Sequence, residues 1–153
     1  YQQEKLKLSK QIIEVPDLKI IATDISEDAI NISKINAGAA GVEGLISFKI
    51  CDFGDTEIPE NSSGIVFLNP EYGERMGDSV ELETTYRGIG DFFKNKCKGY
   101  TGYIFTGNLD LAKKIGLKAK RKIEFYTSRI DCRLLEYELY AGTKRSVKAE
   151  GNI

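Results

Sequence analysis

Short apolar runs alternate with helical patterns along this chain, and this alternation restricts its fold more than any other feature. The predicted order is strand, helix, strand, strand, helix, strand, helix, strand, strand, and the first strand is the isoleucine-rich run at residues 18–23. Such alternation is typical of an open α/β sheet of mostly parallel strands. The last two runs, at residues 119–126 and 132–140, predict an antiparallel hairpin at the sheet edge. We therefore expect an α/β fold with a mostly parallel sheet and a C-terminal hairpin.

The remaining elements are predicted from the same patterns. Further strands are expected at residues 45–50, 64–68 and 100–106, and helices at residues 26–41, 80–96 and 109–115. The first helix has the clearest ends, because Ser26 is a good N-cap residue and Gly41 a natural C-cap. In the second helix, Gly88 and Gly90 weaken the helical pattern, so we expect an irregular centre there.

The composition excludes several kinds of site. The chain of 153 residues contains no histidine, which removes histidine metal sites and the Ser-His and Cys-His catalytic devices, and we expect no metal. Its hydrophobic fraction of 41% and charged fraction of 29% are typical of a soluble globular domain. No apolar run approaches the roughly 20 residues of a membrane span, and no secretory signal pattern is present. We therefore expect a cytoplasmic protein in which Cys51, Cys97 and Cys132 are buried or half-buried thiols.

The charge is distributed unevenly along the chain. Residues 1–75 carry seven basic and 13 acidic side chains, whereas residues 76–153 carry 15 basic and ten acidic ones. Part of the basic excess is a cluster between residues 113 and 122, formed by Lys113, Lys114, Lys118, Lys120, Arg121 and Lys122. Such a cluster suits contacts with phosphate groups, and a solvated basic face explains it equally well.

The tetrapeptide Asn69-Pro70-Glu71-Tyr72 follows the apolar run 65–68 and carries the most specific chemistry. The exocyclic amine of a nucleobase is a poor nucleophile, because its lone pair is delocalised into the ring. The Asn69 carboxamide oxygen and the Pro70 carbonyl can both accept hydrogen bonds from such an amine and orient it. The Tyr72 ring can stack on the base, an interaction that contributes about 1–3 kcal/mol.

This motif resembles the Asn-Pro-Pro-Tyr signature of the amino-group methyltransferases that use S-adenosylmethionine. With the following Gly73-Glu74-Arg75-Met76-Gly77, it is most similar to the branch that methylates the exocyclic amine of guanine in large-subunit ribosomal RNA. The resemblance implies that Asn69, Pro70 and Tyr72 hold the target base. It also implies an RNA partner whose target base is unpaired or flipped out, and Arg75 is a candidate for a backbone contact.

Three polar residues, Asp24, Asp52 and Asn69, fall at the C-terminal ends of predicted parallel strands, where ligands bind in open α/β sheets. An aspartate at a strand end can also simply cap its loop. By resemblance to class I methyltransferases, Asp24 accepts hydrogen bonds from the ribose hydroxyls of S-adenosylmethionine and Asp52 accepts one from its adenine amine. Ile25, Phe53 (which lies against the adenine ring) and Asn69 belong to the same cofactor site in this interpretation.

Two departures from the family pattern keep alternatives open. Glu71 replaces the second proline of the signature, so its carboxylate either bonds to guanine N1–H, points into water or abolishes activity. The glycine-rich cofactor loop of the family is also absent from this sequence. The alternative functions are therefore an adenine-N6 DNA methyltransferase, a methyltransferase of glutamine in proteins, and a non-catalytic RNA-binding remnant of the fold.

The absent loop also bears on the domain organisation. In the family this loop follows the central strand, so we expect a sheet that lacks its middle strand and leaves two apolar strands with open edges. We expect residues 18–145 to be the C-terminal part of a Rossmann-like class I methyltransferase domain from a longer protein. Residues 1–17 form a lead-in segment and residues 146–153 a tail in this interpretation.

Overall fold

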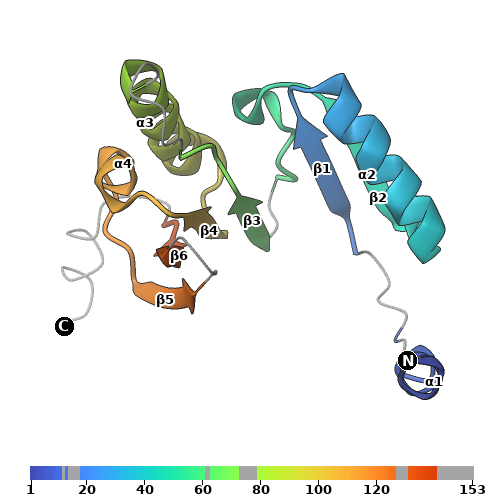
Figure 1. Cartoon of the computed structure of the whole chain (residues 1–153). Coiled ribbons are helices and arrows are strands. Elements are labelled where there is room, and N and C mark those ends of the chain that lie inside the picture. Colours follow the sequence, from blue (N-terminus) through green and yellow to red (C-terminus); the bar gives the residue numbers. More distant parts are fainter. Residues whose placement is uncertain (12, 14–17, 61–62, 73–78, 127–130, 141–153) are drawn as a thin grey trace, which may run out of the picture. The chain divides into compact units, whose positions relative to one another are not determined.

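The computed structural model describes residues 1–11, 13, 18–60, 63–72, 79–126 and 131–140 (Figure 1). The contacts within the chain divide it into two compact units, Tyr1–Asp52 and Phe53–Ile153. The helices and strands are α1 (Gln2–Ser9), β1 (Ile20–Asp24), α2 (Glu27–Ala40), β2 (Ile46–Ile50), β3 (Ile65–Leu68), α3 (Ser79–Lys96), β4 (Thr101–Thr106), α4 (Leu109–Lys114), β5 (Arg121–Tyr126) and β6 (Asp131–Glu138). After α1, this order is the one predicted from the alternation of apolar and helical patterns.

The first unit contains a parallel pair of strands joined by one helix. Strands β1 and β2 pair in parallel, with Asp24 opposite Ile50. The side chain of Ser26 accepts a hydrogen bond of 3.2 Å from the Ala29 amide, and Gly41 ends α2 with a φ of 74°. Both predicted caps are therefore confirmed, and they are what limits the helix to the segment between the two strands.

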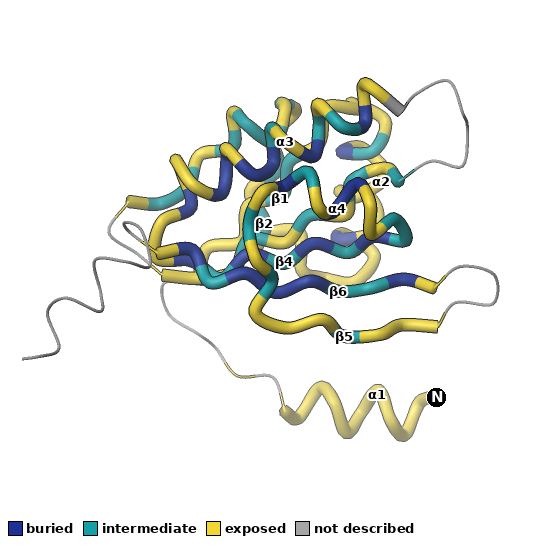
Figure 2. The backbone as a smooth tube through the Cα atoms, turned by 90° about the vertical axis from the view of Figure 1, so that its left-hand side faces the viewer, coloured by how far each residue is buried: buried dark blue, intermediate teal, exposed yellow. Residues whose placement is uncertain are grey.

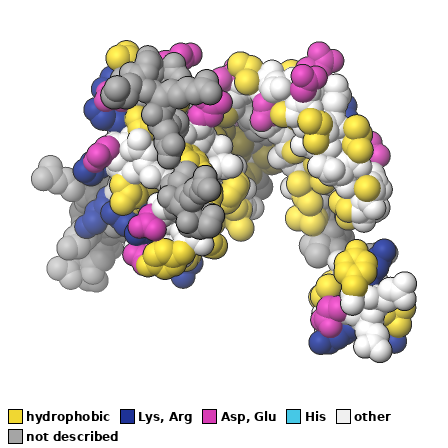
Figure 3. All heavy atoms as spheres, viewed as in Figure 1, with side chains coloured by type: hydrophobic (Ala, Val, Ile, Leu, Met, Phe, Trp, Pro, Cys, Tyr) yellow, Lys and Arg dark blue, Asp and Glu magenta, His cyan; other side chains and the backbone are white. Residues whose placement is uncertain are grey.

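The first unit buries few of its own side chains. On α2 only Ile30 and Ala37 are buried, while Ile32 and Ile35 are 59% and 70% exposed. Figure 3 shows apolar side chains at the surface of this unit. Two strands and one helix thus do not enclose a core of their own within the described part of this unit, as expected for so small a sheet.

The second unit is built on a four-stranded sheet with the order β3-β4-β6-β5. Strands β3 and β4 are parallel, whereas β6 runs antiparallel to both β4 and β5. Helix α3 supplies much of the core, through side chains that are fully or almost fully buried together with residues of the strands (Figure 2). These residues are Tyr86, Ile89 and Phe93 of α3, Ile104 of β4 and Leu135 of β6. The predicted C-terminal hairpin at the sheet edge is confirmed.

The described strands form two sheets rather than one, and β1 and β3 each pair with a single neighbour. On β3, Ile65 and Phe67 are 70% and 59% exposed. The prediction of a mixed α/β fold in which two apolar strands keep open edges is therefore confirmed. The proposed domain limits remain a prediction, because residue 145 and its neighbours lie outside the described residues.

The expectation of an irregular centre in α3 is wrong, because α3 is one continuous helix of 18 residues. A Cβ atom added at Gly90 would lie 2.0 Å from the backbone carbonyl oxygen of Ile115, just after α4. The glycine therefore permits a close approach of two backbones instead of interrupting the helix. At Gly88, an added Cβ would meet only the tip of the Phe53 ring, at 3.4 Å.

This difference between the two glycines predicts opposite effects of one substitution. Gly90→Ala forces α3 and the end of α4 apart, and we expect it to lower the free energy of unfolding by about 1–3 kcal/mol or more. Gly88→Ala is the matched control, and its better helix propensity should raise that free energy by up to about 1 kcal/mol. Urea unfolding followed by circular dichroism measures both. Equal effects of the two substitutions would contradict the close-approach explanation.

Candidate functional site

In the first unit, two of the predicted cofactor residues lie at one edge of the parallel pair. Asp24 is the last residue of β1, and its backbone carbonyl accepts a hydrogen bond of 3.0 Å from the Cys51 amide at the end of β2. Asp52 is the next residue along the chain, so both carboxylates follow the C-terminal ends of paired parallel strands. Both side chains are exposed.

The local role of Asp24 is also visible. Its Oδ1 accepts a hydrogen bond of 2.8 Å from the Ser26 amide, which forms the turn that leads into α2. A carboxylate has two oxygens and about four acceptor positions, so this bond orients the group and leaves it able to accept others. Loop capping and ligand binding are therefore compatible at Asp24. Ile25, in the same turn, is 74% exposed.

In the second unit, the tetrapeptide follows the C-terminal end of β3. Leu68 at the end of β3 is paired with Ile104 of β4, so residues 69–72 lie at the same edge of the sheet as the end of β4. The antiparallel β6 begins at this edge, with Arg133 opposite Thr106. Within the motif, Asn69 and Glu71 are exposed, while Pro70 and Tyr72 are half-buried.

One contact ties the motif to the sheet. The Tyr72 hydroxyl lies 4.0 Å from the Sγ atom of Cys132 at the start of β6, and either atom can be the donor. Cys132 is 1% exposed. Its hydrogen bond to the phenol raises the pKa of Tyr72, and the charge of a Cys132 thiolate and partial burial act in the same direction. The ring of the proposed base-stacking residue is thus attached at its far end to a buried atom of the scaffold.

A second tyrosine stands close to this contact. Tyr86 of α3 is fully buried, and its hydroxyl makes a hydrogen bond of 2.8 Å with the Thr106 Oγ1 atom at the end of β4. Burial raises the pKa of Tyr86, the Thr106 hydrogen bond opposes this effect, and the charge of an ionised Tyr72 adds to it. The two phenols therefore interact electrostatically.

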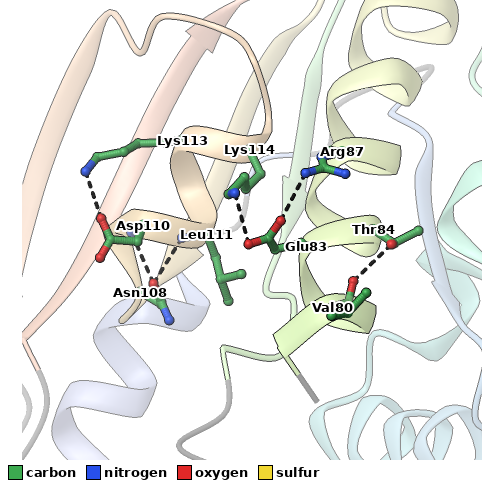
Figure 4. A network of polar contacts seen from close by, with 9 residues as sticks. All are labelled: Val80, Glu83, Thr84, Arg87, Asn108, Asp110, Leu111, Lys113 and Lys114. Atoms are coloured by element: carbon green, nitrogen blue, oxygen red, sulfur yellow. Dashed lines mark hydrogen bonds and ion pairs between the residues drawn. The ribbon is translucent and has the colours of Figure 1, made fainter. Parts of the chain in front are cut away.

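The loop after β4 is held by hydrogen bonds at the same edge. The Thr106 Oγ1 atom accepts a hydrogen bond of 3.1 Å from the Asn108 amide. Asn108 in turn caps α4, because its Oδ1 accepts hydrogen bonds of 3.1 and 3.0 Å from the amides of Asp110 and Leu111 (Figure 4). Polar side chains thus fix the course of the chain beside the motif.

The predicted cofactor residue Phe53 belongs to the second unit, where it has a packing role. Its half-buried ring contacts Phe92 of α3 edge-on, with the ring centroids 5.8 Å apart and the planes at 74°. Contact with an adenine ring remains a prediction for Phe53.

The basic cluster is largely neutralised by carboxylates of the same unit. Lys113 bonds to Asp110 at 2.7 Å and Lys114 to Glu83 at 2.9 Å (Figure 4). The other two pairs are Lys120 with Glu138 and Arg121 with Glu136. Four of the six cations therefore have acidic partners, which favours the solvated basic face for most of the cluster. Lys118 and Lys122 are exposed.

Two further searches concern the described residues only. Nowhere among them do three or more histidine, cysteine, aspartate or glutamate side chains form a group able to hold a metal ion. Likewise, none of their helices has the length and apolarity that crossing a membrane requires.

The sequence was compared with known protein families and relatives. Residues 2–136 match the model of the family described as "RMKL-like, methyltransferase domain". The chain belongs to this methyltransferase family. One relative, the ribosomal RNA large subunit methyltransferase K/L of Syntrophotalea carbinolica, is 33% identical over 123 residues, which are 78% of this chain. The matched part is only 17% of that relative's length.

Two solved structures are similar to this member of the methyltransferase family. SMU.472, a candidate methyltransferase complexed with SAH, is superimposed with a TM-score of 0.79 over 93% of this chain and 37% of its own, and its 23% identity shows the fold alone. A predicted N6-adenine-specific DNA methylase from Listeria monocytogenes is 31% identical, with a TM-score of 0.66 over 77% of this chain and 30% of its own.

The sequence alone did not reveal the contacts around the motif of this methyltransferase. Cys132 was expected to be a buried or half-buried thiol, which is confirmed, but its contact with a residue 60 positions away was not foreseen. Thr106 and Tyr86 were placed correctly in a strand and on the core side of a helix, yet their hydrogen bond left no local signal. The extension at residues 73–78, including Arg75, lies outside the described residues.

The buried Tyr86–Thr106 hydrogen bond predicts a specific loss of stability. Thr106→Val keeps the shape of the side chain but leaves the Tyr86 hydroxyl and the Asn108 amide without this partner. We expect the free energy of unfolding to fall by about 1–3 kcal/mol. Thr84→Val is the control, because the exposed Thr84 hydroxyl bonds only to the carbonyl of Val80 one turn earlier in α3 (Figure 4). Its effect should stay within about 0.5 kcal/mol, and equal losses in urea unfolding would refute this interpretation.

Proposed function

We propose that this chain is part of an enzyme that transfers a methyl group from S-adenosylmethionine to the exocyclic amine of an RNA base, most specifically N2 of guanine in large-subunit ribosomal RNA. The observation that carries the proposal is the motif Asn69-Pro70-Glu71-Tyr72, exposed or half-exposed after a parallel strand, in a chain of a methyltransferase family. The name of the Syntrophotalea relative supports an RNA substrate.

The residues at the strand ends fit the proposed cofactor. SMU.472, which has the same fold, is complexed with SAH, the demethylated form of S-adenosylmethionine. The exposed carboxylates of Asp24 and Asp52 are pure acceptors, as ribose hydroxyls and an adenine amine require. When bound, the cofactor supplies the methyl group, and the protein supplies binding and orientation. We assign Ile25, Phe53 and Asn69 to the same site.

The motif then acts on the base. The Asn69 carboxamide and the Pro70 carbonyl accept hydrogen bonds from the amine, which keeps its lone pair directed at the methyl group while a proton is lost to solvent. Tyr72 stacks on the base and restricts its motion. A base inside a duplex cannot reach this loop, so the substrate presents an unpaired or flipped base. The exposed Glu71 points away from the interior of its own unit.

The second candidate is methylation of adenine N6 in DNA. It is favoured by the similarity to the Listeria protein, which is described as an N6-adenine-specific DNA methylase. Guanine N2 and adenine N6 are both exocyclic amines, so the same acceptors and the same stacking residue serve either one. The nucleic acid that is labelled must therefore decide between the two.

The first test measures methyl transfer by the full-length protein. Incubation with radiolabelled S-adenosylmethionine and separate pools of unmodified ribosomal RNA, DNA and protein should label the RNA, and nucleoside analysis should find the label on guanine N2. Asn69→Ala removes one amine acceptor and should lower kcat/KM by roughly 10- to 100-fold. Asn95→Ala, at an exposed position of α3, is the control and should have no effect. Label found only in DNA supports the second candidate, and no label in any pool supports a non-catalytic remnant.

The second test addresses the cofactor site. Asp24→Asn keeps an acceptor for the Ser26 amide, so the turn is retained, but it removes the negative charge. We expect the affinity of the full-length protein for S-adenosylhomocysteine to fall at least about tenfold, because an ionised acceptor forms the stronger hydrogen bonds. Asp28→Asn, in the first turn of α2, is the control and should leave the affinity unchanged. Titration calorimetry decides this, and equal affinities of all three proteins would exclude Asp24 from the site.

A further inference from the structure

The contact between Tyr72 and Cys132 joins two parts of the second unit that are far apart in the sequence. Tyr72 lies after β3, and Cys132 is the second residue of β6. The Tyr72 hydroxyl and the Cys132 Sγ atom are 4.0 Å apart. Neighbouring motif residues Asn69 and Glu71 are exposed, so this contact distinguishes Tyr72 from them.

Cys132 belongs to the rigid part of the unit. It lies opposite Phe125 in the antiparallel pairing of β5 with β6, and it is 1% exposed. The Phe125 ring in turn packs edge-on against Phe105 of β4, with ring centroids 5.7 Å apart. A side chain attached to such a position has little freedom to move.

A stacking residue works best when its ring has one orientation before the base arrives. A tyrosine side chain has two rotatable bonds that set the ring, and a contact at the hydroxyl, the atom farthest from the backbone, restricts both. Fixing the ring in advance reduces the entropy that is lost when the base binds.

We propose that Cys132 is a positioning residue, whose thiol holds the Tyr72 hydroxyl and thereby fixes the phenol ring in the orientation that stacks on the target base. This proposal rests on the proposed function of the motif, since the ring has a task only if a base is bound there. Cys132 itself touches neither the base nor the cofactor in this role. It acts through Tyr72.

A double-mutant cycle in the full-length protein tests whether Cys132 acts through Tyr72. Tyr72→Phe keeps the stacking ring and removes the hydroxyl, and Cys132→Ala removes the thiol. Each should lower kcat/KM for methylation by roughly three- to tenfold, the range of one hydrogen bond. Adding Cys132→Ala to Tyr72→Phe should then change kcat/KM less than twofold, because the contact is already lost.

Cys97→Ala is the matched control for the loss of a buried thiol. Cys97 is 0% exposed, but it follows α3 and precedes β4, at the opposite edge of the sheet. It should leave kcat/KM unchanged in both the wild-type and the Tyr72→Phe proteins. Additive losses from Tyr72→Phe and Cys132→Ala would overturn the proposal, and so would an unchanged kcat/KM in Tyr72→Phe, a variant that does not disturb the core.

A second measurement does not depend on activity. Nuclear magnetic resonance of protein labelled with ¹³C at the tyrosine Cζ atoms follows the ionisation of each phenol, and Tyr72→Phe assigns the Tyr72 signal. The pKa of Tyr72 should lie above its ordinary value in the wild type and in Cys97→Ala, and it should fall in Cys132→Ala.

The two measurements separate failure of the inference from failure of the proposed function. If no substrate is methylated but the Tyr72 pKa responds to Cys132→Ala, the proposed function is lost and the anchoring contact stands. If methylation is observed and the pKa of Tyr72 is the same in all three proteins, the positioning role of Cys132 is overturned.

Discussion

The parallel pairing of β3 with β4 is the constraint on which the candidate site depends. Because Leu68 is paired with Ile104, the motif leaves the sheet at the edge where β4 ends and the antiparallel β6 begins. A register shift of one residue would turn every side chain of β3 to the opposite face and would separate Tyr72 from Cys132. The backbone pairing thus determines which side chains the motif can reach.

The packing of α3 on this sheet keeps that pairing in place. Tyr86, Ile89 and Phe93 fill the space between helix and strands, and Gly90 allows the backbone after α4 to approach closely. The Tyr86 hydroxyl then reaches Thr106 at the same edge of the sheet. The helix therefore contributes both to the apolar core and to the polar contacts that order the loop after β4.

The charges of the second unit change the interpretation of its basic cluster. As a stretch of sequence, residues 113–122 suit a phosphate-binding surface, but four of the six cations are paired with carboxylates from α3, α4 and β6. A paired surface cation attracts phosphate less than an unpaired one. Recognition of a nucleic acid by this chain therefore depends more on the motif loop than on the cluster as a whole.

The sequence by itself determined the order of helices and strands, the caps Ser26 and Gly41 and the resemblance of the motif to a methyltransferase signature. All of these depend on neighbouring residues, whose periodicity and capping chemistry act over one or two turns. Only the tertiary structure decided why Gly90 is a glycine, which acids neutralise the lysines, and that Cys132 contacts Tyr72. These contacts join residues 25 to 60 positions apart, and chain folding, which no local pattern encodes, brings them together.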